Sequence, residues 1–349
     1  MSRLHDAASG LLRRINPETA HRLTIGALKA GLGPALAAAD PLLAVRLAGL
    51  SLPNCVGLAA GFDKNGEVPD AMLRAGFGFV ECGTVTPLPQ AGNPTPRLFR
   101  LSDDRAVINR MGFNNEGLEA FAARLGSRRR TGVVGANIGA NKDSADRIAD
   151  YVAGLRRLWG LASYFTVNIS SPNTPGLRAL QTRSALQELL GRLAEARGEL
   201  SARGDAPVFL KVAPDLDDAE IEAICEVAAV HGLDALIVGN TTLARPETLR
   251  SAHRNESGGL SGAPLMDAST AVLRRFHLAA GGRIALIGAG GVASGADAYA
   301  KIRAGAAAVQ LYSAMVFEGP GLVGRIRREL AALLAADGFS NVAEATGAG

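Results

Sequence analysis

Eight short apolar segments, separated by longer stretches with helical periodicity, constrain the fold of this chain most strongly. Each segment is apolar along most of its length, as strands of a parallel sheet are when helices cover both faces. Eight such units favour closure into a barrel over an open sheet. We therefore predict an α/β fold, a (β/α)8 TIM barrel, with strands at residues 56–59, 79–82, 133–138, 164–168, 208–212, 235–238, 284–287 and 308–311.

Three further features concern the connections. Residues 50–52 and 54–56 are short apolar segments, and we expect them to pair as a hairpin at the floor of the barrel. The gaps at residues 83–113 and 239–262 are long. Connections of that length without regular structure are usually lids or binding loops.

Residues 1–45 differ from the rest, because they contain helical patterns and no strand. Asn16, Pro17 and Glu18 are typical of a helix start, with an N-cap, a proline in the first turn and an acid near the positive end of the helix dipole. This helix should run to about Ala30 and stop at Gly31. We predict an N-terminal helical extension, residues 1–45, and a barrel domain, residues 46–349.

The first helix of this extension has two possible roles. Its apolar residues share one face and its arginines lie mostly off that face, a pattern typical of helices that lie on a membrane surface. The same face could instead pack on the barrel, and the residues alone do not separate the two. The residues concerned are Leu4, Leu11, Leu12 and Ile15 on the apolar face, and Arg3, Arg13 and Arg14.

The composition limits the kinds of partner and site. With 349 residues, 48% of them hydrophobic, the chain can bury one large core. The net charge of +4 suits anionic ligands or lipid. The basic cluster at residues 128–130 lacks interleaved aromatic side chains for stacking bases, so we expect no nucleic-acid partner. Cys55, Cys82 and Cys225 lie far apart in apolar sequence, which indicates buried thiols and no metal site.

Polar or glycine-rich residues follow each predicted strand, and the carboxyl ends of barrel strands meet at one mouth, where such barrels carry their chemistry. The richest loop, residues 168–178, contains Asn168, Ser171 and Asn173 and is stiffened by two prolines. A capped turn uses the same residue types, but the position after a buried strand favours a site. Together the strand ends predict a pocket of amides, hydroxyls and two lysines.

The loops after the seventh and eighth strands predict a phosphate cradle. A glycine turn that opens a helix directs backbone N–H groups at an anion, and barrels often hold a phosphate at these two loops. We assign this role to Gly290, Gly291, Tyr312 and Ser313. Residues 288–293 also match a dinucleotide fingerprint, but no acidic residue follows at the distance needed to bind a ribose, which argues against a nicotinamide cofactor.

Lys64 and Lys211 are the two lysines at strand ends. Lys211 lies within the apolar segment 208–212, where a buried cation is costly unless it faces a site. A fixed cation there can stabilise negative charge on a bound group. We predict that Lys211 faces the barrel interior and that Lys64 pairs with a substrate carboxylate; a surface position is the alternative for either lysine.

Several segments resemble, in the same order, motifs of the class 2 dihydroorotate dehydrogenases, which are quinone-dependent and membrane-associated. Residues 168–176 resemble their catalytic loop, and residues 16–23 resemble the N-terminal extension that separates class 2 from the soluble enzymes. Gly239 stands where the family usually has threonine, and Ala140 where many members have lysine. Further similar motifs lie at residues 60–66, 81–87, 92–97, 109–114, 240–242, 258–262 and 309–313.

The resemblance implies one FMN per chain, dihydroorotate as the substrate, orotate as the product, and Ser171 as the catalytic base. The implied flavin ligands are Ala60, Gly61, Phe62, Asp63, Lys64, Thr84, Asn137, Asn168, Lys211, Gly239, Gly262, Gly290, Gly291, Tyr312 and Ser313. The implied substrate ligands are Lys64, Asn109, Arg110, Met111, Gly112, Phe113, Asn168, Asn173, Asn240 and Thr241. The implied quinone-site residues are His21, Arg100 and Tyr312.

In the implied reaction, a step of pyrimidine (UMP) biosynthesis, Ser171 removes the C5 proton and the C6 hydride passes to FMN. A serine hydroxyl is a weak base, so it needs a proton outlet, such as a water relay, and a polarised substrate. A membrane quinone entering beside the N-terminal helices then takes the electrons. We expect a monomer attached peripherally to the lipid bilayer, on the cytoplasmic face of a bacterial inner membrane.

The sequence motifs bear on three rival interpretations. The soluble class of the same enzyme uses a cysteine base, and Ser171 and the N-terminal extension argue against it. A tRNA dihydrouridine synthase would need a cysteine acid and a nucleic-acid face. A non-catalytic phosphate-binding barrel would not require several asparagines at one mouth, and it would lack the yellow colour of a flavoprotein.

Overall fold

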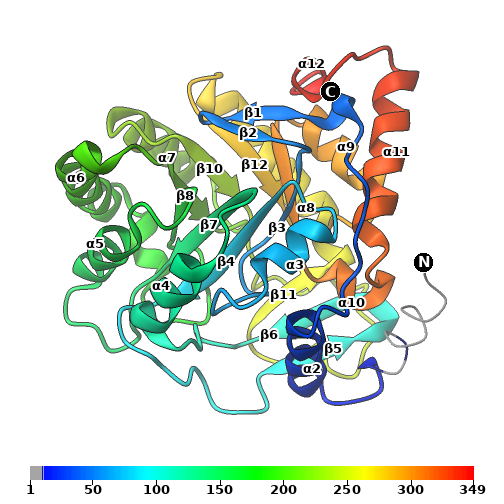
Figure 1. The fold of residues 1–349 in the computed structure, drawn as a ribbon, viewed down its shortest axis with the longest axis horizontal. Helices are drawn as coiled ribbons and strands as arrows, with labels where there is room; N and C mark the ends of the chain where they lie inside the picture. Colours follow the sequence, from blue (N-terminus) through cyan, green and yellow to red (C-terminus); the bar gives the residue numbers. More distant parts are fainter. Residues whose placement is uncertain (1–9, 11) are drawn as a thin grey trace.

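The computed structural model describes residue 10 and residues 12–349. Within that part of the chain, eight parallel strands close into a barrel, which confirms the predicted fold (Figure 1). Each strand pairs with the next in chain order, and the last returns to the first. In chain order they are β3 (Val56–Leu58), β4 (Phe79–Val85), β7 (Val133–Ile138), β8 (Tyr164–Asn168), β9 (Val208–Val212), β10 (Ala235–Val238), β12 (Ala285–Ala289) and β13 (Ala308–Leu311).

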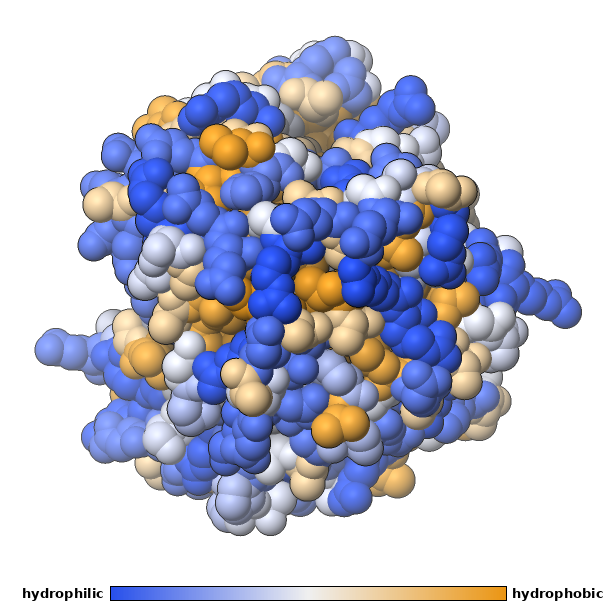
Figure 2. Space-filling view, turned by 90° about the vertical axis from the view of Figure 1, so that its left-hand side faces the viewer, coloured by the Kyte–Doolittle hydropathy of each residue, from blue (hydrophilic) through white to orange (hydrophobic). Residues whose placement is uncertain are grey.

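Helices follow the strands and surround the barrel (Figure 1). The helices that follow barrel strands are α3 (Pro69–Arg74), α4 (Gly117–Ser127), α5 (Arg147–Leu158), α6 (Arg183–Leu200), α7 (Asp218–Val230), α8 (Met266–Ala280), α9 (Gly295–Arg303), α10 (Ala314–Glu318) and α11 (Leu322–Ala336), with α12 (Val342–Ala345) at the C-terminus. Short 3-10 turns occur at Pro41–Leu43, Ser102–Asp104, Arg178–Gln181, Ser201–Arg203 and Ala263–Leu265. The face over α5, α6 and α7 is mostly hydrophilic, with hydrophobic residues in separate patches (Figure 2).

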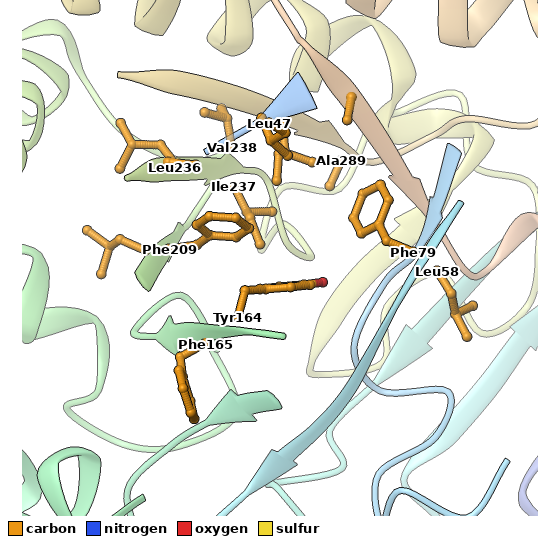
Figure 3. Packing of buried hydrophobic residues seen from close by; sticks show 14 of the residues in the cluster. Leu47, Leu58, Phe79, Tyr164, Phe165, Phe209, Leu236, Ile237, Val238 and Ala289 are labelled. Carbon is orange, nitrogen blue, oxygen red and sulfur yellow. The ribbon is translucent and has the colours of Figure 1, made fainter. Parts of the chain in front are cut away.

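Aromatic side chains fill part of the barrel interior. The rings of Phe79, Tyr164 and Phe209 point toward one another (Figure 3), with Tyr164 stacked on Phe209 at a centroid distance of 4.7 Å. Glycines on two strands make room for them, because a Cβ at Gly57 would lie 2.2 Å from the Phe79 ring and one at Gly135 would lie 2.1 Å from the Tyr164 ring. This packed layer leaves the carboxyl ends of the strands for polar side chains.

The predicted hairpin is wrong in its pairing. Strand β2 (Leu50–Leu52) pairs with β1 (Val45–Leu47), and residue 56 instead begins the first barrel strand. The turn consists of Ala48 and Gly49, both with positive φ, as two-residue hairpin turns require. An Ala-Gly pair is a weak turn signal, so the sequence pattern favoured the wrong partner.

The two long gaps also differ from the prediction, because they contain strands. Within them, β5 (Leu98–Leu101), β6 (Ala106–Asn109) and β11 (Gly259–Gly262) form an antiparallel sheet of order β11-β6-β5. Apolar side chains from all three strands pack together with Leu249 as a small core of their own. The two gaps therefore form one structured cover over the barrel mouth instead of two separate loops.

Helix α2 (Pro17–Lys29) has the predicted bounds to within a residue, and Oδ1 of Asn16 accepts hydrogen bonds from the backbone N–H groups of Glu18 and Thr19. Ile25 and Leu28 on this helix belong to the same buried cluster as the barrel core. Figure 1 shows α2 beside β5 and α10, at the opposite end of the barrel from the β1–β2 hairpin. The predictions for Arg3, Leu4 and Leu11 lie outside the described residues.

The three cysteines match the prediction. Cys55, Cys82 and Cys225 are buried free thiols. Among the described residues, no helix is both long enough and apolar enough to cross a membrane.

Candidate active site

A cavity of about 830 Å³ lies between the carboxyl ends of the barrel strands, the β5–β6–β11 sheet and α2. It collects predicted site residues that are spread over almost the whole sequence. Those that line it are His21, Ala60, Gly61, Phe62, Lys64, Thr84, Arg100, Asn109, Met111, Gly112, Phe113, Asn168, Ser171, Asn173, Lys211, Gly239, Asn240, Thr241, Gly262, Gly290, Gly291, Tyr312 and Ser313.

Three predicted site residues lie outside the cavity lining. The buried carboxylate of Asp63 accepts hydrogen bonds from the backbone N–H groups of residues 67 and 68, both at 2.8 Å, and so shapes the loop that carries Lys64. Asn137 accepts a hydrogen bond from Oγ1 of Thr84 at 2.5 Å. The side chain of Arg110 forms an ion pair with Glu256 at 2.8 Å. The side chains of these three residues bind neighbouring protein groups and do not face the cavity.

A buried amide network holds the loop after β8. Nδ2 of Asn168 donates to Oγ1 of Thr84 at 2.9 Å, and Oδ1 of Asn168 accepts from Oγ of Ser170 at 2.7 Å. Nδ2 of Asn240, from the loop after β10, donates to the same Ser170 hydroxyl at 2.7 Å. Ser170 therefore joins two predicted substrate ligands. Ser170 was not among the predicted site residues, although its place in the Ser-Ser pair beside Ser171 was the available signal.

Ser171 is 6% exposed and lines the cavity. Its Oγ accepts a hydrogen bond from the backbone N–H of Asn173 at 3.2 Å. Within the described part of the chain, no side chain or backbone oxygen accepts the Ser171 hydroxyl proton in a hydrogen bond. The hydroxyl can therefore turn its proton toward a ligand or a water in the cavity, as a proton-transfer group must.

An acid that the sequence analysis did not single out lies beneath the cavity. Glu81 on β4 is completely buried inside the barrel. Its negative charge acts against the burial that lowers the pKa of Lys211. The available signal for Glu81 was a charged residue within an apolar strand, the same kind of signal that pointed to Lys211. The donors to its carboxylate are Nδ2 of Asn137 at 2.7 Å, Oγ1 of Thr166 and Nε2 of Gln310, both at 2.9 Å, and the Tyr164 hydroxyl at 3.3 Å.

The other cavity lysine, Lys64, lies among charges from outside the barrel. Its pKa is lowered to about 8, mainly by burial and also by the positive charge of Arg97, while the carboxylate of Glu18 on α2 acts in the opposite direction. Such a lysine is a cation at neutral pH that loses its proton in mildly alkaline solution. It is suited to binding a carboxylate.

An aromatic and histidine group lines the cavity beside α2. Nδ1 of His21 lies 3.5 Å from the Tyr312 hydroxyl, and the Phe62 ring packs edge-on against both rings. The pKa of His21 is lowered to about 4, mainly by burial and also by the positive charge of Lys64, so His21 is neutral near pH 7. Arg100, also in the lining, donates to the backbone oxygen of Arg13 at 2.5 Å.

Glycines allow the backbone to bend closely around this cavity. Gly291, with φ of +81°, would place a Cβ 2.4 Å from Cα of Met266 at the start of α8. Gly239 has φ of +116°, and a Cβ there would lie 2.4 Å from the carbonyl oxygen of Ala289. A threonine at position 239, as the resembling family usually has, would therefore not fit this backbone without a shift of β12.

One wall of the cavity is apolar. Leu12, Leu23, Ala27 and Leu28 line it from the N-terminal segment. Met315, Val316, Pro320 and Val323 add further apolar lining from α10, α11 and the turn between them. Leu23 is 55% exposed although it lines the cavity, so the apolar channel reaches the molecular surface. The cavity thus changes from buried amides at one end to an open hydrophobic channel at the other.

A closed barrel with polar groups gathered at the carboxyl ends of its strands defines an enzyme of the (β/α)8 class. Comparison with known proteins narrows this class. The profile of the family described as Dihydroorotate dehydrogenase matches residues 42–334. The chain belongs to the dihydroorotate dehydrogenase family.

Its relatives agree along nearly the full length. The protein named dihydroorotate dehydrogenase (quinone) of Parvibaculum lavamentivorans is 60% identical over 99% of this chain and 98% of its own. The protein of the same name from Novosphingobium aromaticivorans is 59% identical, with 97% of each chain covered. The chain is therefore a member of the quinone-dependent group, whose chemistry uses a flavin.

Solved structures show the same fold. The dihydroorotate dehydrogenase of Eimeria tenella in complex with ferulenol matches with a TM-score of 0.92 and 42% identity, over 95% of each chain. The ligand-free enzyme of the same organism also has a TM-score of 0.92, with 43% identity over 95% of this chain and 99% of that chain.

Proposed function

We propose that this chain oxidises (S)-dihydroorotate to orotate, holds one FMN, and passes the electrons to a membrane quinone. The observation that carries the proposal is the continuity of one cavity. Ser171 and the asparagine side chains lie at its polar end, and the apolar channel along α2 forms its other end. A polar substrate and a hydrophobic electron acceptor could thus bind at different ends of the same cavity.

The residues present fit FMN. Gly290 and Gly291 line the cavity, and the absence of a Cβ lets Gly291 pack directly against the start of α8. The backbone N–H groups of this glycine turn would hold the phosphate. Lys211 lines the cavity from inside the barrel and, among the described residues, donates no hydrogen bond to protein. FMN bound here would supply the hydride acceptor and carry the electrons onward. Lys211 would stabilise the negative charge of the reduced ring.

The substrate end suits a carboxylated cyclic amide. Lys64 would pair with the carboxylate, and Asn109, Asn173 and Asn240 would bind the ring amides. Oγ1 of Thr241 is buried and has no protein partner, so it is available to the substrate. Ser171 would remove the C5 proton, since its hydroxyl is free to pass its own proton to water. The positive charge of Lys64 would then stabilise the charge that develops on the substrate.

The quinone end lies beside α2. We infer that residues 1–45 form the entrance for the quinone, with His21, Arg100 and Tyr312 at its inner end, and that residues 46–349 form the FMN-binding barrel. The exposed apolar residues at the mouth, such as Leu23, support peripheral contact with a lipid bilayer. The basic residues of this segment would favour an anionic surface on the cytoplasmic face of the bacterial inner membrane. We further propose that the chain works as a monomer, because the cavity is complete within one chain.

Anaerobic stopped-flow mixing tests the proposal directly. The purified yellow protein should lose its flavin absorbance when mixed with dihydroorotate and recover it when a quinone is added. Extraction and chromatography should identify the flavin as FMN at one molecule per chain. A flavin that dihydroorotate does not bleach would refute the proposed substrate.

A further inference from the structure

Helix α2 is joined to the barrel mouth by a largely buried ion pair. Nη2 and Nε of Arg97 donate to the two carboxylate oxygens of Glu18 at 2.7 and 3.2 Å. The Arg97 side chain is 10% exposed and that of Glu18 22%. Such two-point pairing between guanidinium and carboxylate is geometrically specific. The hydrogen bond from Arg97 is also the largest cause that lowers the pKa of Glu18, so the carboxylate is ionised at neutral pH.

The same arginine holds the loop that precedes β5. Its Nη1 donates to the backbone oxygens of Ala91 and Asn93 at 2.6 and 2.9 Å. No other carboxylate pairs with Arg97 in the part of the chain that the structure describes. Without Glu18, Arg97 would be a nearly buried cation whose charge is not compensated by a carboxylate. Nothing would then hold the guanidinium group against these two carbonyl groups.

From this loop the contacts continue into the substrate end of the cavity. Nδ2 of Asn93 donates to the backbone oxygens of Arg110 and Asn173 at 3.0 and 3.1 Å. Asn173 in turn donates its side-chain amide to Oδ1 of Asn109 at 3.2 Å and its backbone N–H to Oγ of Ser171. A continuous series of hydrogen bonds therefore runs from α2 to the serine proposed as the base.

Charge links the same residues to Lys64. The carboxylate of Glu18 raises the pKa of this lysine and Arg97 lowers it. Removal of Glu18 would leave Lys64 beside Arg97 alone, which disfavours its charged form. The helix thus acts on the substrate end through both geometry and charge.

We infer that Glu18 is a positioning residue for dihydroorotate oxidation: through Arg97 and Asn93 it holds the Asn109–Asn173 pair and the Ser171 loop in place, and so couples the quinone-side helix to the substrate side. The inference rests on the proposed function. It means that α2 is part of the dihydroorotate half-reaction although it lies on the quinone side of the cavity.

The experiment compares the two half-reactions in the flavin-loaded Glu18→Ala variant. Reduction of the flavin by dihydroorotate should slow by about tenfold or more, because a shift of about 1 Å in a positioning network can cost about a hundredfold. The dissociation constant of orotate, read from the flavin spectrum, should rise. Flavin content and reoxidation by a small soluble quinone should stay within about twofold of the wild type.

Lys29 offers a matched control on the same helix. Its ammonium group pairs with Glu67 of the barrel at 2.7 Å, but Lys29 is 54% exposed and lies outside the cavity lining. Lys29→Ala also removes an ion pair between α2 and the barrel, and it should leave both half-reactions within about twofold. An equal slowing of flavin reduction by Lys29→Ala and Glu18→Ala would show that helix docking in general is responsible, and would overturn the inference.

Two further variants keep the inference falsifiable. If Glu18→Ala does not hold flavin, Glu18→Gln, which keeps the shape and removes the charge, is judged by the same flavin-reduction rate. Because Glu18 acts through Arg97, the double variant Glu18→Ala/Arg97→Ala should be no slower than Arg97→Ala alone. The inference would be overturned by flavin reduction within twofold of wild type in the Glu18 variant. Additive losses of the flavin-reduction rate in the double variant would overturn it as well. Failure of dihydroorotate to bleach the wild-type flavin would instead refute the proposed function.

Discussion

The Tyr312 hydroxyl at the end of β13 lies 3.5 Å from Nδ1 of His21 on α2. This contact joins the last barrel strand to the N-terminal helix inside the cavity, where the proposed flavin and quinone regions meet. His21 is neutral because burial lowers its pKa to about 4, so it can exchange a hydrogen bond with Tyr312 or a quinone without adding charge.

Replacing His21 by alanine should therefore impair electron delivery to the quinone. We expect reoxidation of the reduced flavin by a long-chain quinone to slow by about tenfold, the equivalent of a contact worth ~1.4 kcal/mol. Bleaching by dihydroorotate should change less than twofold, since Glu18 and Arg97 remain. Double-mixing stopped flow measures both steps. Equal slowing of both steps would place His21 outside the quinone site.

Ser171→Ala should hold FMN and slow flavin reduction by about a thousandfold, the typical contribution of a general base. Flavin binding should persist because the other lining residues come from different strands. Ser171→Cys should not restore the wild-type rate, since a thiol differs in pKa and reach. Single-turnover bleaching under anaerobic conditions gives these rates, and near-normal bleaching by the alanine variant would remove Ser171 from the mechanism.

Lys211→Met should lower the reduction potential of the flavin and weaken its binding. The variant removes the cation in the cavity lining and leaves the buried Glu81 carboxylate, which disfavours a negatively charged reduced ring. Redox titration against a reference dye measures the potential. Lys142→Met, at an exposed lysine outside the cavity lining, is the control. Equal potentials in wild type and Lys211→Met would show that Lys211 does not act on the flavin.

Orotate binding should weaken in alkaline solution. The pKa of Lys64 is about 8 in the free site, so its positive charge is present below that pH and is lost above it. The orotate dissociation constant should be nearly flat from about pH 6 to 7 and rise by up to about tenfold per pH unit well above 8. Spectral titration from pH 6 to 9.5 gives this profile. Lys64→Met should bind weakly at every pH, and a persisting rise in that variant would assign the effect to another group.

The barrel and its strand ends were predictable because burial of a parallel strand on both faces leaves a local signature. The apolar segments at residues 164–168 and 208–212 match β8 and β9 along their whole length. The cap at Asn16 was also local, since its side chain reaches only three residues along the chain. Family motifs then pointed to the residues that line one cavity, and the choice of Ser171 as base remains a prediction.

Only the tertiary structure decided the pairings between distant segments. Glu18 and Arg97 are 79 residues apart, and the strands that cover the barrel mouth, β6 and β11, come from two separate connections. Glu81 and Ser170 showed their roles only when their partners from other strands were placed around them. A strand or a helix cap is determined by neighbouring residues. The partner of a buried charge depends on which chain segments the closed barrel brings together.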